Sequence, residues 1–359
     1  MKQIKILIAD NSFVYKKMFT QGAKEVCDNS SVVSAANGDE TYALIKRNNF
    51  DIIIIDAEIS GMGLFELLRV IKVNLPKAFT LVMVRPSSAH DKLFPEAISR
   101  GAAECMIKPI YDSYGDNLEI IKRKISEIID VLRSGPETEN AGETSVQACT
   151  ADPSCTADPS CAAGTAAETG FRPEIVLIAT STGGPAALET ILPQIRGDFP
   201  VPILIIQHIP TNFTEGLAKN LDQKSKIKVK VAEDKETISA GTAYFAPGGA
   251  HMKLDIKHRV YLDDSPPRSG VRPAADVLFE SVAESFAGLS VLTVILTGMG
   301  SDGKEGLLRL KEKTECFCLS QSEKTCVVYG MPRAVAEEGL TDKILDLDMI
   351  PAEIGSIVY

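Results

Sequence analysis

The stretch Glu174-Ile-Val-Leu-Ile-Ala-Thr-Ser-Thr-Gly-Gly-Pro185 joins an apolar run to a small, glycine-rich turn. An apolar run without alternation predicts a strand that is buried on both faces, here over residues 174–179. Pro185 is typical of the first turn of a helix, where the missing N–H is not needed. A strand that passes through a tight turn into a helix predicts a doubly wound, Rossmann-like α/β sheet, with Ser181 at the apex of the turn.

Two more polar side chains follow predicted buried strands. His208 comes shortly after the run Ile203–Ile206, and Asp302 lies in the glycine-rich loop that follows Val291–Leu296. Because the carboxyl ends of parallel strands share one edge of the sheet, we expect Ser181, His208 and Asp302 to meet there. A serine hydroxyl needs a base to take its proton, and a carboxylate orients that base, so the three residues fit a Ser-His-Asp relay. The structural alternative makes Ser181 and Asp302 helix caps and His208 an ordinary loop histidine.

The loop after the third of these strands also resembles a nucleotide-binding loop. Gly298-Met-Gly-Ser-Asp-Gly-Lys304 has the spacing of a P-loop between a strand and a helix. Glu305 stands where a Ser or Thr should ligate Mg²⁺, and Asp302 would put a carboxylate inside the phosphate cradle. Both acids repel phosphate, so the pattern disfavours nucleotide binding.

Residues 1–133 alternate between apolar runs and helical patterns five times. Apolar residues spaced three and four apart separate the runs, and the last such pattern extends from Leu118 to Leu132. Five strand–helix units predict a second doubly wound sheet, of flavodoxin-like order. The predicted strands are Ile4–Ala9, Val32–Ala35, Ile52–Ile55, Thr80–Val84 and Glu104–Ile107.

Charged residues end three strands of this first sheet. Asp10 follows the first strand, Asp56 the third, and Lys108 the fifth. Asp10 and Asp56 together could hold Mg²⁺, and the lysine could pair with a phosphoryl group. The alternative is that the two aspartates cap the helices that follow them.

Charge and composition divide the 359-residue chain into three parts. The net charge is −10, but residues 134–170 contain six acidic and no basic residues, so the rest of the chain carries only −4. Low apolar content predicts a disordered, low-complexity linker there, between domains at 1–133 and 171–359. No basic surface that would favour nucleic acid is indicated. Apolar runs are too short for a membrane span, and the N-terminus resembles no signal peptide, so we expect a cytoplasmic protein with reduced cysteines.

The first domain resembles response-regulator receiver domains along its full length. By that resemblance Asp56 is the phospho-acceptor, Lys108 the family lysine and Asp10 one member of the acidic pair. A histidine kinase would then supply the phosphoryl group. Two residues depart from the family pattern, because Asn11 replaces the second acid and Arg85 replaces the usual Ser or Thr. We therefore expect a receiver that is phosphorylated poorly or switches differently.

The second domain resembles the catalytic domain of CheB chemotaxis methylesterases. The matching stretches are Ala-Thr-Ser-Thr-Gly-Gly-Pro185, Ile-Gln-His-Ile-Pro210, Ala-Pro-Gly-Gly-Ala-His251, Ile-Leu-Thr-Gly-Met-Gly-Ser-Asp-Gly303 and Tyr-Gly-Met-Pro-Arg333. That family hydrolyses glutamyl methyl esters on methylated chemoreceptors, and some members deamidate glutamine.

The resemblance to this family also implies roles for individual residues. Ser181 would be the nucleophile, His208 the base and Asp302 the orienting acid. No cofactor is needed for the ester chemistry. The candidates for the oxyanion-binding or substrate loop are Thr182, Gly183, Gly184 and Met299. A non-enzymatic signalling scaffold is the alternative, and the complete set of Ser181, His208 and Asp302 counts against it.

Overall fold

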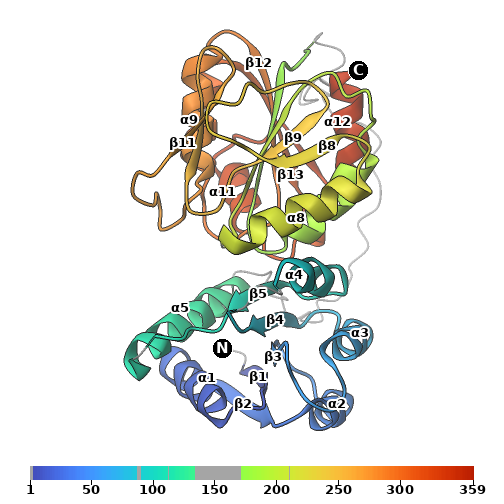
Figure 1. Cartoon of the computed structure of the whole chain (residues 1–359), viewed down its shortest axis with the longest axis vertical. Helices are drawn as coiled ribbons and strands as arrows, with labels where there is room; N and C mark the ends of the chain where they lie inside the picture. The colour runs from blue at the N-terminus through green and yellow to red at the C-terminus, as the bar shows by residue number, and fades with distance from the viewer. Residues whose placement is uncertain (1–2, 87–89, 112, 134–170, 210) are drawn as a thin grey trace, which may run out of the picture.

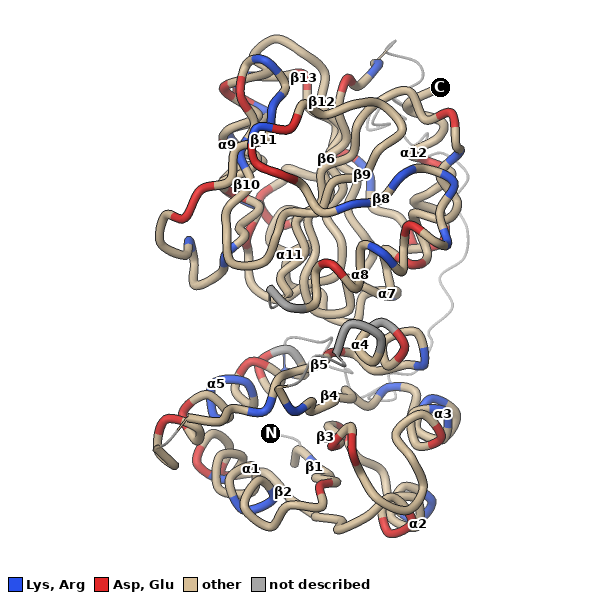
Figure 2. Tube along the Cα trace, viewed as in Figure 1, with Lys and Arg blue, Asp and Glu red and all other residues tan. Residues whose placement is uncertain are grey.

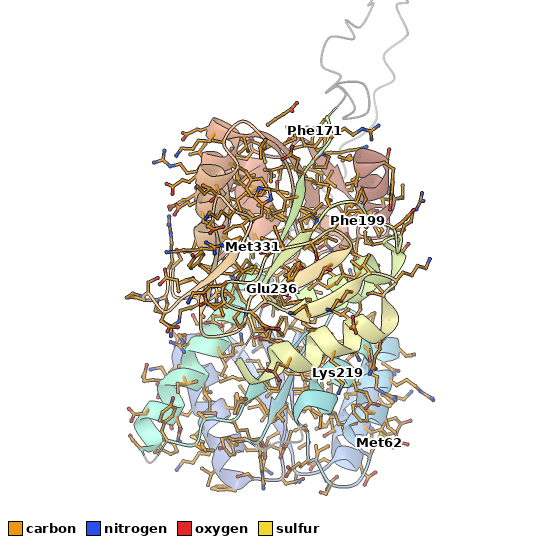
Figure 3. The ribbon with its side chains drawn as sticks, turned by 45° about the horizontal axis from the view of Figure 1, so that its top comes forward. Met62, Phe171, Phe199, Lys219, Glu236 and Met331 are labelled. Atoms are coloured by element: carbon orange, nitrogen blue, oxygen red, sulfur yellow. The ribbon has the colours of Figure 1, made fainter. Side chains whose placement is uncertain are left out.

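The computed structural model describes residues 3–86, 90–111, 113–133, 171–209 and 211–359. Two α/β units lie one above the other in Figure 1: a first unit up to residue 133 and a second unit from residue 171. Side chains fill both units, as Figure 3 shows, and Lys/Arg and Asp/Glu residues are interspersed over both in Figure 2. The predicted linker at 134–170 lies outside the described residues, and the domain boundaries stay predictions.

The first unit has a five-stranded parallel sheet in the order β2-β1-β3-β4-β5. Its strands are β1 (Ile4–Ala9), β2 (Ser30–Ala35), β3 (Ile52–Asp56), β4 (Phe79–Val84) and β5 (Glu104–Ile107). Its helices are α1 (Phe13–Val26), α2 (Gly38–Arg47), α3 (Leu64–Asn74), α4 (His90–Ser99) and α5 (Tyr114–Arg133). Every residue of β3 and β4 is buried, because helices cover both faces of the sheet.

The second unit has a seven-stranded parallel sheet in the order β14-β13-β12-β6-β7-β9-β8. Its strands are β6 (Ile175–Thr180), β7 (Ile203–Gln207), β8 (Lys228–Val231), β9 (Thr242–Phe245), β12 (Ser290–Ile295), β13 (Glu315–Gln321) and β14 (Lys343–Leu345), and a separate antiparallel pair is β10 (His251–Leu254) and β11 (Val260–Asp263). Its α-helices are α7 (Gly184–Ile191), α8 (Thr211–Lys224), α9 (Ala275–Ser285), α10 (Lys304–Lys313), α11 (Met331–Glu337) and α12 (Ile350–Val358).

Both predicted parallel sheets are present. The three strands that were expected to carry the site, at 174–179, 203–206 and 291–296, correspond to β6, β7 and β12 within one residue at each end. These three strands are neighbours in the sheet, in the order β12-β6-β7. Their carboxyl ends therefore bring the residues that follow them to one edge.

The two units touch through helix α4 of the first unit. Helix α4 packs against α7 and α8, and the rings of Phe94 and Phe213 stack with their centroids 4.5 Å apart. Figure 1 shows α4 and β5 directly below α8. Within the described residues, no helix is long and apolar enough to cross a membrane.

Candidate active site

A cavity of about 630 Å³ opens at the carboxyl edge of the second sheet. Ser181, His208, Asp302 and Met299 line it from the second unit. The first unit closes its other side with residues of β5 and α5, namely Glu104, Arg123, Lys124 and Glu127. The three residues of the predicted relay therefore share one cavity, and the receiver-like unit covers part of it.

Backbone hydrogen bonds on both sides hold Ser181 at the end of β6. Its N–H donates to the carbonyl of Thr297 at 3.0 Å. Its carbonyl accepts from the N–H of Gly184 at 2.9 Å and from Nε2 of the buried Gln207 at 2.9 Å. The turn is closed by Gly183, whose φ of +81° is a left-handed conformation that favours glycine. An ideal Cβ at Gly183 would also lie 2.6 Å from Cβ of Val327.

His208 and Asp302 form a direct pair inside the cavity. Nε2 of His208 lies 2.8 Å from Oδ2 of Asp302, and both side chains are largely buried. An ionised carboxylate only accepts hydrogen bonds, so Nε2 carries the proton and Nδ1 is left as the basic nitrogen. The N–H of His208 donates to the carbonyl of Thr180, the residue before Ser181, at 3.1 Å. This bond joins the ends of β6 and β7, one residue before Ser181.

Asp302 is held by the start of helix α9. Its Oδ2 accepts from the N–H of Ala275 at 2.5 Å, and its Oδ1 accepts from the N–H of Asp276 at 3.0 Å. Burial alone would raise the pKa of Asp302. The hydrogen bond and the electrostatic attraction of the His208 imidazole, together with the two backbone N–H groups, outweigh burial and hold the pKa below its ordinary value of 3.8. Asp302 therefore stays ionised beside the imidazole.

The candidates for an oxyanion hole lie in two loops. Thr182 and Met299 line the main cavity, and Gly183 lines a smaller adjoining cavity of about 30 Å³. The N–H of Gly184 already donates to the carbonyl of Ser181, so it is not free to bind an oxyanion. The remaining candidates for oxyanion donors are the N–H groups of Thr182, Gly183 and Met299.

Two amides at the end of the loop that resembles a P-loop and at the start of the following helix are occupied. Oδ1 of Asp276 accepts from the N–H of Gly303 at 3.0 Å and from the N–H of Gly306 at 2.8 Å. A phosphate would have to displace a buried carboxylate from these donors. The geometry therefore disfavours nucleotide binding at this loop, as the two acidic residues predicted.

The charged residues of the first unit also come together as predicted. Nζ of Lys108 lies 2.7 Å from Oδ2 of Asp10 and 2.8 Å from Oδ2 of Asp56, and all three side chains are buried. Burial raises the pKa of Asp10 above 3.8, against the lowering effects of Lys108 and of the N–H of Ser12. Oδ1 of Asp10 accepts from that N–H at 2.7 Å, and Oδ1 of Asp56 accepts from the N–H of Glu58.

The two residues that depart from the receiver pattern have their own partners. Nδ2 of Asn11 donates to the carbonyl of Glu58 at 2.8 Å, and Oδ1 of Asn11 accepts from the N–H and the hydroxyl of Ser60. Nε of Arg85 lies 3.4 Å from the Glu58 carboxylate in an exposed ion pair. The carboxylates of Asp10 and Asp56 fit a hard cation such as Mg²⁺, but Asn11 contributes no charge to that site.

Sequence reasoning missed the contact that connects the two units at the site. The hydroxyl of Thr182, next to Ser181, donates to Oε2 of Glu104 at 3.2 Å. Lys124 of α5 forms an ion pair with the other oxygen of Glu104. Glu104 stands at the start of β5 in no recognisable motif, and a contact between residues 78 positions apart leaves no periodic signal in the sequence.

Comparisons with known proteins match both units. The CheB methylesterase family model matches residues 176–354, and the response regulator receiver domain model matches residues 6–114. A protein-glutamate methylesterase/protein-glutamine glutaminase of Desulfotalea psychrophila is 35% identical over 99% of this chain and 98% of its own. A protein of the same name from Geobacillus kaustophilus is 37% identical over 100% and 99%. The solved CheB methylesterase catalytic domain of Thermotoga maritima is 40% identical, with a TM-score of 0.49, over 51% of this chain and 97% of its own.

Proposed function

The chain belongs to the CheB methylesterase family, and from this premise we propose that Ser181, His208 and Asp302 carry its reaction. Its relatives are named protein-glutamate methylesterase/protein-glutamine glutaminase, and the chain is accordingly a protein-glutamate methylesterase with a receiver domain for regulation. The proposed substrates are glutamyl methyl esters on methylated chemoreceptors, and the name of the relatives supports side-chain amides of glutamine as a second substrate class. The observation that carries the residue assignment is the His208–Asp302 pair in the cavity that Ser181 lines.

The proposed mechanism is a two-step acyl transfer. Ser181 Oγ attacks the ester carbonyl while Nδ1 of His208 takes the hydroxyl proton. The imidazolium, stabilised by Asp302, returns this proton to the leaving methoxide, and methanol departs from the acyl-enzyme. His208 then takes a proton from water, the hydroxide attacks the acyl-enzyme, and the glutamate is released as Ser181 regains its proton. With a glutamine side chain the same steps release ammonia.

Backbone donors supply the remaining stabilisation in this proposal. The negative charge that develops on the carbonyl oxygen needs N–H groups near Ser181. Thr182, Gly183 and Met299 lie in the two loops that border the cavity, and their N–H groups are the proposed donors. No metal is assigned to the ester chemistry.

Removal of the nucleophile tests the assignment. We expect Ser181→Ala to reduce methanol release from methylated chemoreceptor membranes by about 10⁶-fold, to near background, because no acyl-enzyme can form. Circular dichroism should be unchanged, since Ser181 holds its place through backbone groups. Substantial methanol release by the folded variant would contradict the mechanism. A wild-type protein that releases no methanol would favour the scaffold alternative.

We also propose how the receiver regulates the reaction. Glu104 and Lys124 cover the cavity in the structure, and Glu104 bonds the residue next to the proposed nucleophile. Phosphorylation of Asp56 by a histidine-kinase phosphodonor would shift this face and admit the receptor segment. Mg²⁺ at Asp10 and Asp56 would neutralise charge on the incoming phosphoryl group. If Asn11 and Arg85 prevent this step, the enzyme is constitutive or answers to a partner.

A further inference from the structure

Two aspartates of the catalytic domain cap each other's helices. The N-cap residues of α9 and α10 are Ala274 and Gly303, whose side chains offer no acceptor. Asp302, just before α10, accepts from the first amides of α9. Asp276, in the first turn of α9, accepts from the N–H groups of Gly303 and Gly306 at the start of α10. Each helix therefore obtains its capping acceptor from the other.

The same two helices approach each other closely at this point. An ideal Cβ on Gly306 would lie 2.6 Å from Cβ of Phe279 and 2.9 Å from the backbone of Asp276. A glycine is therefore needed at 306 for the carboxylate of Asp276 to reach the N–H groups of α10. Asp276 and Asp302 are 2% and 5% exposed, so water does not replace these bonds.

We propose that Asp276 is a positioning residue for the proposed relay, fixing the Asp302 carboxylate against Nε2 of His208. This inference rests on the proposed function of Asp302. Asp276 fixes the loop that carries Asp302 by its bond to Gly303, the next residue in the chain. The first-turn amides of α9 hold the carboxylate itself. Loss of the Asp276 bonds frees the N–H of Gly303 and so loosens the loop that carries Asp302. A small displacement of Asp302 would then change the orientation of the His208 imidazole.

The charges around Asp276 suit a group that acts through its hydrogen bonds. Burial, together with the negative charges of Asp302 and Glu305, raises its pKa, against the lowering effects of the Gly306 N–H and of Arg268. A neutral side chain with an oxygen at the Oδ1 position can accept the same two N–H groups. We therefore expect asparagine, but not alanine, to replace Asp276.

The test compares Asp276→Ala with Asp276→Asn in the full-length protein. For Asp276→Ala we expect a kcat for methanol release about 10–100-fold lower with KM within about twofold, since the substrate contacts are unchanged. The low-field proton signal of the His208 ring N–H, assigned with His208→Gln, should weaken or disappear in NMR spectra. Asp276→Asn should restore both kcat and the signal.

Ser281→Ala is the matched control on the same helix. Ser281 bonds Leu254 and Leu278 away from Asp302, so its loss destabilises α9 without touching the relay. A wild-type kcat or an intact ring signal in Asp276→Ala would overturn the proposal. An equal loss in Ser281→Ala, or failure of Asp276→Asn to restore activity, would also overturn it.

Two further variants, Asp276→Ser and Ser181→Ala, complete the test. If Asp276→Ala does not fold, Asp276→Ser, with its shorter acceptor, takes its place with the same expectations. Failure of the proposed function would be seen separately, as methanol release by Ser181→Ala, while the His208 ring signal would still report on the position of Asp302.

Discussion

The two carboxylate oxygens of Asp302 accept three hydrogen bonds. They accept from the imidazole of His208 and from two backbone N–H groups, and each of these bonds favours the ionised acid. The carboxylate therefore keeps its charge in a buried place where burial alone would raise its pKa. That charge fixes the proton on Nε2 of His208 and leaves Nδ1 as the nitrogen that we propose as the base.

Asp302→Asn tests this role of the charge. The amide has the same size, but its NH₂ group faces either His208 and Ala275 at the Oδ2 position or the N–H of Asp276 at the Oδ1 position. In both orientations the negative charge that holds the imidazole in its productive tautomer is lost. We expect kcat for methanol release to fall by about 10³–10⁴-fold in a folded protein, the loss typical of a replaced orienting acid. Glu305→Gln, in the exposed first turn of α10, should keep wild-type activity. More than a tenth of wild-type activity in Asp302→Asn would contradict the relay.

Arg85 and Asn11 make a prediction for the receiver site. Asn11 provides an amide where the family has a carboxylate, and Arg85 provides a permanent cation where it has a hydroxyl. We expect little phosphate to accumulate on Asp56 with a small phosphodonor and Mg²⁺. The double variant Asn11→Asp, Arg85→Thr should accumulate about tenfold more, the effect of about 1.4 kcal/mol in cation and phosphoryl binding. Normal phosphorylation of the wild type, measured by intact-protein mass, would refute this expectation.

Among the helices and strands, the strands that are buried inside a sheet were the ones that the sequence predicted directly. The strands β6, β7 and β12 lie inside the sheet, so their sequences are continuous apolar runs that indicate strands directly. The short strands β10 and β11 were not predicted, because four residues pairing with one another carry too little pattern. That Ser181, His208 and Asp302 meet in one cavity was predictable because each follows a buried strand. The capping role of Asp276 was not, because it depends on how α9 packs against α10.

Gly183 sets the turn between β6 and α7, and its replacement tests that element. Gly183→Ala requires a left-handed alanine and pushes a Cβ into Val327. We expect a loss of about 1–2 kcal/mol in the free energy of unfolding by urea, together with a lower kcat, because the turn carries Ser181. Gly355→Ala is the control: no described atom lies within 4 Å of its ideal Cβ in helix α12. That variant should be slightly more stable than wild type; equal stability of both variants would show that the turn tolerates a side chain.

For the whole molecule, the central feature is that the two domains share one cavity. The catalytic domain supplies the three residues of the proposed relay, and β5 and α5 of the receiver supply the opposite wall. The sequence predicted both domains but not their contact, because a surface formed by residues such as Glu104 and Thr182 leaves no spacing pattern. At the site itself the contact between the domains is the polar Thr182–Glu104 hydrogen bond, which is weak enough to break when the receiver face moves away.

Glu104→Ala tests the cover in the unphosphorylated protein. The change removes the acceptor of the Thr182 hydroxyl and the partner of Lys124. We expect basal methanol release to rise about fivefold, which corresponds to about 1 kcal/mol of lost contact energy. Glu119→Ala removes an exposed ion pair with Lys122 elsewhere on α5 and should leave the basal rate unchanged. An unchanged or reduced rate in Glu104→Ala would show that the contact does not restrain the enzyme.

The cover and the enzyme belong to one polypeptide, and this has a kinetic consequence. A tethered surface acts at an effective concentration that dilution cannot change, commonly in the millimolar range. If the receiver restrains the enzyme as proposed, that restraint is the same in a cell with few copies as in a cell with many. A receptor segment must compete with this fixed local concentration for the same cavity. The unphosphorylated enzyme should thus show a raised apparent KM, while kcat at saturating substrate stays that of the uncovered site.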